Sequence, residues 1–230
     1  MESYNIKQIN RHLYGIQTIQ EIAKNAGVTE SIDALQGWQN QRFLISHKTL
    51  HQDINSKKAL EVLVYKIFSR QELIAKDIDN SELIAKACKF LPKELLSTLA
   101  SALQLNLVCL ELDFELAQIT KTTSINQDIY THAYLASYNI PLRQKQLSSL
   151  KQLGDNLANL NLYWGIASLL NLYRYPAKYF ALTPLHEFIE LIFHAFNQVS
   201  SCEEFFHAIV AKESELMPEY LDPAASKLKV

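Results

Sequence analysis

The chain has 230 residues, of which 48% are hydrophobic and 20% charged, with a formal net charge of -2. This length and composition are those of a globular protein that buries a substantial core. The near-neutral charge argues against nucleic acid as a partner, because nucleic acids attract basic surfaces. Only 5 glycines and 6 prolines occur, and none builds a glycine-rich loop of the kind that binds phosphates.

The three cysteines are far apart and form no CxxC pair. We interpret Cys88, Cys109 and Cys202 as buried thiols in a reducing compartment. The opening residues MESYNIKQINRH lack the basic and apolar regions of a secretory signal, so we expect a cytoplasmic protein. The uncharged stretch 156–173 contains four asparagines, which a membrane-spanning helix tolerates poorly, and we expect no transmembrane segment.

In the first part of the chain, apolar residues recur at helical spacing. Gly27 is placed to end the first helix, and capping patterns at Ser69 and Asp79 predict two later helix starts. The second helix, from Thr29 or Ser31, carries an apolar stripe that includes Trp38 and Arg42. The helical ranges predicted here are 3–26, 29–53, 57–68, 69–76 and 79–92.

The segment Lys93–Ile119 is predicted to be the central helix. Part of it, LQLNLVCLELDFEL, alternates like a strand, but its flanks are strong helix formers and no turn residue interrupts it. A helix with apolar residues on two faces is buried between other helices.

In the second half, Gly154 marks a point where a long helix can kink, and Tyr175-Pro176 is expected to break the helical pattern. Thr183 with Pro184 predicts one helix start, and Ser201 with Glu204 forms a capping box at another. The predicted elements are a loop at 120–126 and helices at 127–138, 141–173, 183–199 and 201–218.

We therefore predict an all-α fold of roughly eight to ten helices around a buried central helix. Residues 1–230 are interpreted as one domain, because no Pro/Gly/Ser-rich linker and no fixed-period repeat divides them. The loop 120–126 is the one plausible place for a boundary between two parts of this domain. The tail 222–230 is expected to be loosely attached.

Two polar residues lie seven apart on the apolar part of the predicted central helix: Asn106 and Asp113. A buried carboxylate needs a partner or a raised pKa. Arg42 and Arg143 are candidate partners. Asp113 is then either a buried polar tie between helices or a carboxylate that faces a ligand.

Histidines and carboxylates at helical spacing near the C-terminus suggest a second candidate site. On one helix they lie four residues apart, and on the next a Glu-x-x-His pair follows, a spacing seen in di-iron bundles. Solvated helix faces are the competing interpretation, because metal ligands need partners from several helices. The set comprises His186, Glu190, His194, Glu204 and His207.

Aromatic residues are concentrated after residue 162, and they form either core between the last helices or a pocket for an apolar ligand. Nucleophilic catalysis finds little support, because the sequence contains no GxSxG, P-loop or HExxH motif.

Several segments, taken in order, resemble the FFLEELY-motif family of uncharacterised bacterial proteins. At the signature itself the chain departs from the family, with Lys58-Ala59 and Val62 in place of aromatic pairs and a second glutamate. The matching segments are Trp38-Gln39-x-x-Arg42-Phe43, 60–65, Lys76-Asp77, Leu91-Pro92, Leu112-Asp113, Arg143-Gln144, Tyr175-Pro176-Ala177, Phe188-Ile189-Glu190, Ala195-Phe196 and Lys212-Glu213. The resemblance implies a helical bacterial protein and supplies no catalytic residue.

The sequence thus favours a non-enzymatic helical module that binds a protein partner or a second copy of itself, without a cofactor. The alternative is a bundle that binds a metal or small molecule, either an oxidoreductase resembling heme-oxygenase-like di-iron proteins or a binder of apolar ligands. The candidate binding residues are Trp38, Arg42, Asp113, Arg143 and Glu190.

Overall fold

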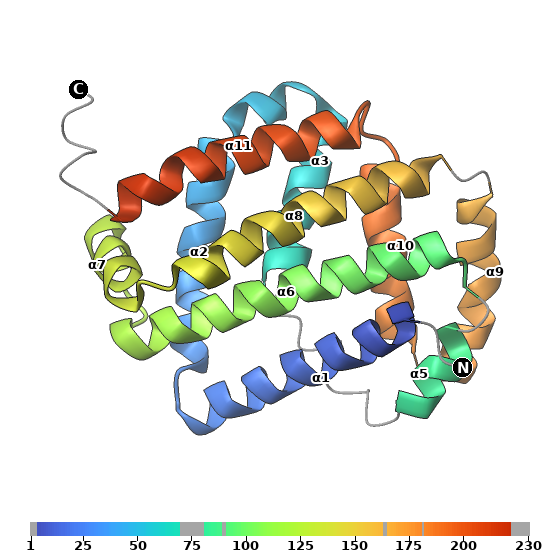
Figure 1. The fold of residues 1–230 in the computed structure, drawn as a ribbon, viewed down its shortest axis with the longest axis horizontal. Helices are drawn as coiled ribbons and strands as arrows, with labels where there is room; N and C mark the ends of the chain where they lie inside the picture. Colours follow the sequence, from blue (N-terminus) through green and yellow to red (C-terminus); the bar gives the residue numbers. More distant parts are fainter. Residues whose placement is uncertain (1–3, 70–80, 89–90, 163–164, 181, 222–230) are drawn as a thin grey trace.

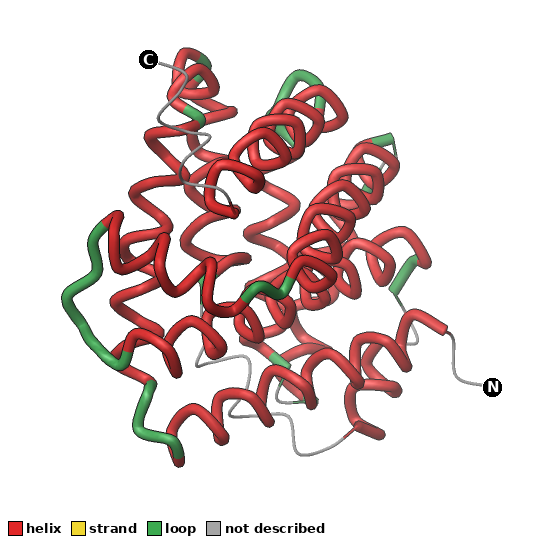
Figure 2. The backbone as a smooth tube through the Cα atoms, turned by 60° about the vertical axis from the view of Figure 1, so that its left-hand side comes forward, coloured by secondary structure: helices red, strands yellow, loops and turns green. Residues whose placement is uncertain are grey.

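The computed structural model describes residues 4–69, 81–88, 91–162, 165–180 and 182–221. Within these ranges the chain forms ten α-helices, one 3-10 helix, one π-helix and no strand (Figure 2), which confirms the all-α prediction. In chain order the elements are α1 (Tyr4–Asn25), α2 (Thr29–Ser46), the 3-10 helix η1 (Lys48–Gln52), α3 (Ile54–Val62), the π-helix η2 (Leu63–Phe68), α5 (Ser81–Cys88), α6 (Lys93–Thr120), α7 (Gln127–Ser137), α8 (Ile140–Asn161), α9 (Ile166–Tyr179), α10 (Thr183–Phe196) and α11 (Cys202–Leu221).

Helices α1, α6, α8 and α11 run side by side in one layer, and α2, α3 and α10 cross behind them (Figure 1). Helix α7 closes one end of the array, while α5 and α9 lie at the other end. Because α6 contacts α1, α2, α7, α8 and η2, it is the central helix that the sequence predicts.

Both apolar stripes of α6 are buried, as shown by Leu99, Leu103, Leu105 and Leu112. This explains why its sequence satisfies two periodicities at once: helices pack against it from several sides. By length and hydropathy α6 would also be long enough to cross a membrane, but 83% of its most apolar segment is buried inside the protein. A core helix of a globular protein has the same properties.

Most predicted boundaries agree with the structure in the described ranges. The capping side chain of Ser201 accepts a hydrogen bond from the Glu204 backbone N–H at 3.2 Å, as its sequence pattern predicts. Two boundaries need adjustment. The N-cap of α10 is Leu182 and not Thr183, and the helix predicted over 29–53 begins at Thr29 but ends at Ser46, after which η1 follows. The predicted helix 69–76 and the cap at Asp79 lie outside the described residues, apart from Ser69.

Three predictions about helix breakers were wrong. The helix predicted over 141–173 is interrupted at Gly165, which has a left-handed φ of 90°. Pro176 lies inside α9, and Pro218 lies inside α11. A proline leaves the carbonyl four residues earlier without its helical donor. For Pro176 that residue is Leu172, which is 71% exposed, so water can donate to its carbonyl.

Gly154 marks the closest approach between α8 and α11. A Cβ at this position would lie 2.6 Å from the Phe206 side chain. We expect Gly154→Ala to lower the free energy of unfolding by about 1–3 kcal/mol, because the helices must separate to admit a methyl group. Urea unfolding measures this change.

Gly37→Ala is the matched control, since it lies within α2 with nothing near its position. Alanine there is expected to stabilise by about 0.5–1 kcal/mol. Equal effects of the two substitutions would contradict the close approach at Gly154.

Candidate ligand pocket

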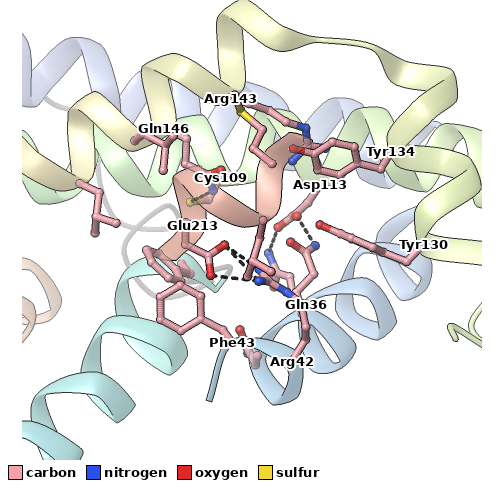
Figure 3. A pocket seen from close by; sticks show the side chains of 17 residues that line it. Gln36, Arg42, Phe43, Cys109, Asp113, Tyr130, Tyr134, Arg143, Gln146 and Glu213 are labelled. Carbon is pink, nitrogen blue, oxygen red and sulfur yellow. Dashed lines mark hydrogen bonds and ion pairs between the residues drawn. The ribbon is translucent and has the colours of Figure 1, made fainter. Parts of the chain in front are cut away.

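A pocket lies between α2, α6, α7, α8 and α11, toward the end of the array that α7 closes (Figures 1 and 3). Its cavity has a volume of about 70 Å³. This is several times the roughly 10–15 Å³ that one water molecule needs. Helix α2 supplies Gln36, Gln39, Asn40, Arg42 and Phe43 to its wall. Helices α6, α7, α8 and α11 supply Cys109, Asp113, Tyr130, Tyr134, Arg143 and Glu213, among others.

One wall of the pocket is fixed by an ionic cluster between α2 and α11. Arg42 donates from Nη1 and Nη2 to both carboxylate oxygens of Glu213 at 3.0 Å, and His47 Nε2 lies 3.0 Å from Glu213 Oε1. Burial favours the protonated form of Glu213, but the His47 hydrogen bond and the Arg42 charge outweigh it, so its pKa is lowered. Bidentate pairs of this kind fix geometry as well as charge.

The second carboxylate, Asp113 of α6, is held by amides and not by an arginine. Gln36 Nε2 donates to Oδ2 at 2.8 Å, and Gln39 Nε2 donates to Oδ1 at 2.7 Å. Burial raises the pKa of Asp113 to about 6, although both hydrogen bonds and the Arg143 charge oppose the rise. The sequence-based expectation of a raised pKa or a partner is therefore met on both counts.

Arg143 of α8 lies against the aromatic ring of Tyr134. Its guanidinium carbon is 3.5 Å from the ring centroid, and the residue is only 7% exposed. Figure 3 shows the pair across the pocket from Arg42 and Phe43. Its Nε and Nη2 atoms are buried and have no hydrogen-bond partner among the described residues. These two donors form one edge of the planar guanidinium group.

Trp38 supports the pocket from outside its wall. Its ring lies 4.4 Å from the ring of Tyr130, centroid to centroid, and Tyr130 lines the cavity. Trp38 is itself partly buried against the core. Of the five candidate binding residues, the structure thus places Arg42, Asp113 and Arg143 in the wall and Trp38 behind it.

Asn106 has a structural role, which separates it from Asp113. Its Nδ2 donates to the carbonyls of Ile67 at 2.7 Å and Ser69 at 2.9 Å. Both carbonyls lie at the end of η2, where a π-helix leaves backbone acceptors that need donors. Asn106 therefore ties α6 to the segment that carries Phe68 into the pocket wall.

Glu190, the fifth candidate, lies apart from the pocket on α10. It accepts a hydrogen bond from Arg174 Nη2 at 2.5 Å, and its carboxylate oxygens are 3.7 Å from His186 Nε2 and 3.8 Å from His194 Nε2. Burial lowers the pKa of His186. Glu190 and Asp113 therefore do not line the same pocket.

The hypothetical metal set is not assembled either. Glu204 and His207 are exposed on α11. Among the described residues, no group of three or more His, Cys, Asp or Glu side chains is placed to hold a metal ion. The pocket thiol gives no support to nucleophilic chemistry, because burial strongly raises the pKa of Cys109.

The late aromatics divide between core and surface. Phe196, Phe205 and Phe206 pack against one another with ring centroids 5.3–5.8 Å apart, as the core interpretation predicts. Tyr175 and Tyr179 are instead exposed. A small apolar cavity does border Tyr173 and His186. Its volume is about 20 Å³, which is little more than one water molecule needs.

The sequence interpretation missed most of the amides and tyrosines of the pocket. On α2 the stripe predicted through Trp38 and Arg42 continues to Ile45, three residues on, yet Ile45 is 72% exposed, and the buried face runs through Gln36, Asn40 and Phe43. The signal was available, because these residues follow Ile32 at spacings of four, four and three. Because Gln36 and Asn40 lie on the buried face, the stripe through Trp38 and Arg42 appeared to be the more apolar of the two.

The fold and the pocket define an all-α helical array with a partly open pocket of mixed polar and apolar lining toward one end. Residues 18–226 match the model of a family described as a domain of unknown function (DUF8198), and the chain belongs to this family. The match does not test the resemblance to FFLEELY-motif proteins, which stays a prediction. Searches of curated proteins and of solved structures found no match.

Proposed function

We propose that this protein binds a small organic anion in the pocket, with the anionic group on Arg143. The observation that carries the proposal is the buried edge of Arg143, whose Nε and Nη2 lack hydrogen-bond partners among the described residues. Leaving a buried charged donor unsatisfied is costly, so such a group marks a place where a partner belongs. A carboxylate or phosphate oxygen pair matches the two parallel N–H groups of this edge.

The neighbouring side chains among the described residues give that edge no acceptor. Tyr134 covers one face of the guanidinium group. Asp113, the carboxylate whose charge acts on Arg143, is instead hydrogen-bonded by Gln36 and Gln39. The carboxylate of Glu213 is taken by Arg42. A bound anion would supply the acceptors that neither carboxylate gives.

Titration with acetate and with inorganic phosphate, followed by NMR of the arginine Nε–H resonances, tests this proposal. We expect wild type to bind at least one of these ions with a shift of the Arg143 resonance. Arg143→Met is expected to lose at least tenfold in affinity, because a charged hydrogen bond is worth about 1.5–3 kcal/mol.

Arg174→Met is the matched control, since Arg174 is exposed outside the pocket and pairs with Glu190. It is expected to bind as wild type does. Arg143→Lys keeps the positive charge but lacks the two-donor edge, so it should fold as wild type and still bind the anion more weakly. It replaces Arg143→Met in this test if the methionine variant does not fold. Undiminished binding by folded Arg143→Met would contradict the proposal.

Self-association is a second candidate function, favoured by an exposed apolar stripe on α9. Leu172, Tyr175 and Tyr179 are 71%, 82% and 84% exposed, and their spacing places them along one face of the helix. Exposed apolar surface of this kind is a feature of association sites. The occupant that we propose is the same face of a second copy, in a two-fold dimer.

Size-exclusion chromatography with light scattering measures this association. We expect a concentration-dependent dimer in wild type and a monomer in Tyr175→Ser/Tyr179→Ser. The control is Tyr14→Ser, an exposed tyrosine on α1. A wild-type monomer at all concentrations would refute self-association and leave the ligand proposal untouched.

A further inference from the structure

We infer that the ligand is an amphipathic monocarboxylate, with its carboxylate on Arg143 and an apolar body of about four to six carbons beyond it. This inference rests on the proposed function and specifies the chemical class of the ligand. Charge, the direction of the pocket wall and the room in the cavity each contribute to it.

The charges that line the pocket favour a monoanion over a dianion. Among its lining residues the cations are Arg42 and Arg143, and the anions are Asp113 and Glu213; lysine does not occur among them. Arg42 already forms a bidentate pair with Glu213. A phosphate dianion would therefore face one available guanidinium edge beside two carboxylates, whereas one carboxylate matches that edge in shape and charge.

An ammonium group on the ligand finds no comparable partner. Both oxygens of Asp113 accept hydrogen bonds from glutamines, and both oxygens of Glu213 accept from Arg42. Each Asp113 oxygen has one further lone pair, but the Arg143 charge already acts on this carboxylate, so an ammonium group there would be neutralised only in part while it loses its water shell. The pocket therefore favours a simple acid over its amino acid analogue.

The direction of the apolar body follows from α8. Leu147 and Leu150 follow Arg143 at spacings of four and three, so all three lie along one helix face, and all three line the pocket. Across from them, Leu216 and Met217 of α11 continue the apolar wall. At 1.5 Å per residue, Leu147 and Leu150 lie about 6–10 Å along the axis from Arg143.

The room available sets the size. The cavity volume of about 70 Å³ holds a small number of water-sized groups, since one water needs at least roughly 10–15 Å³. A carboxylate with a short chain fills that number and spans the distance from Arg143 to Leu150. Hexanoate is therefore a suitable probe, and acetate is its truncated form.

Isothermal titration calorimetry with matched probes tests the class of ligand: hexanoate, acetate, hexanamide, norleucine and hexyl phosphate. We expect hexanoate to bind wild type about 10- to 100-fold more tightly than acetate, from burial of its methylene groups. Hexanamide, norleucine and hexyl phosphate should each bind at least tenfold more weakly than hexanoate. In Met217→Ala, which shortens the apolar wall, the ratio of the hexanoate affinity to the acetate affinity should fall severalfold.

The outcomes separate the two proposals. Tighter binding of hexyl phosphate or norleucine, with loss in Arg143→Met, would overturn the monocarboxylate class and leave the anion pocket standing. Equal affinities for hexanoate and acetate would overturn the apolar body. Binding of none of the probes, or hexanoate binding that Arg143→Met does not weaken, would overturn both proposals.

Discussion

Replacing Glu213 with alanine is expected to lower the free energy of unfolding by about 3–5 kcal/mol, the usual effect of leaving a buried charge unpaired. The side chains of Arg42 and Glu213 are only 16% and 17% exposed, so the remaining guanidinium group cannot simply turn to water. The loss would also detach α11 from α2 at the pocket, since Arg42 and His47 both contact Glu213. Urea unfolding at pH 7 measures it.

Glu215→Ala is the matched control on the same helix. Glu215 pairs with Lys212 at the surface and is 69% exposed, so its loss is expected to cost less than about 1 kcal/mol. Similar effects of the two substitutions would contradict a buried ionic tie between α2 and α11.

The same pair predicts a pH dependence. The pKa of Glu213 is lowered in the folded protein, so its stabilising contribution is fully present above the ordinary value of 4.5 and is lost as the pH falls below it. Wild type should therefore lose stability between pH 5 and pH 3 more steeply than Glu213→Gln. If the two proteins lost stability in parallel over this pH range, ionised Glu213 would not contribute to stability as proposed.

Replacing Asp113 with asparagine is expected to raise stability at pH 7 by about 1–3 kcal/mol. The pKa of Asp113 is raised from 3.8 to about 6, and each pKa unit corresponds to about 1.4 kcal/mol. Folding therefore favours the protonated carboxyl, and ionisation at neutral pH costs stability that asparagine does not lose. Part of the gain is offset, because asparagine has one acceptor for the amides of Gln36 and Gln39.

The sign of this effect makes it distinctive. Between about pH 4 and pH 6 the folded state binds more protons at Asp113 than the unfolded state, so this contribution to stability falls as the pH rises. The advantage of Asp113→Asn should thus vanish near pH 4. Thermal unfolding of both proteins across pH 4–8 measures this difference in stability. If Asp113→Asn were less stable than wild type at pH 7, the claim that ionisation of buried Asp113 costs stability would be contradicted. Loss of this negative charge should also tighten binding of an anion to Arg143.

Much of the fold could be predicted from the sequence because it depends on local patterns. The central helix follows from two apolar stripes without a turn residue, and the start of α11 follows from the Ser201 cap. The breaks were harder to predict. Pro176 lies inside α9, where Leu172, the residue four positions earlier whose carbonyl loses its helical donor, is exposed. Exposure of one helix turn depends on tertiary packing.

The site was predictable in part, for a definable reason. Asp113 stands out as an acidic residue on an apolar face, and the expected arginines Arg42 and Arg143 do line the same pocket. Its hydrogen-bond partners are, however, the amides of Gln36 and Gln39, which the sequence pattern did not indicate. Glu213, by contrast, lies on a helix that also carries exposed glutamates, and no local pattern marks it apart from the family resemblance at Lys212-Glu213. Its pairing with Arg42 joins residues 171 apart in the chain, which only the packing of α11 beside α2 brings about.

Crystallisation of the protein with hexanoate tests the central claim most directly, because the claim concerns two atoms of Arg143. We expect the carboxylate of hexanoate to lie within hydrogen-bond distance of Nε and Nη2 of Arg143, with its chain beside Leu150 and Met217. Hexanoate found elsewhere, or a pocket holding only water at a saturating concentration, would contradict the claim.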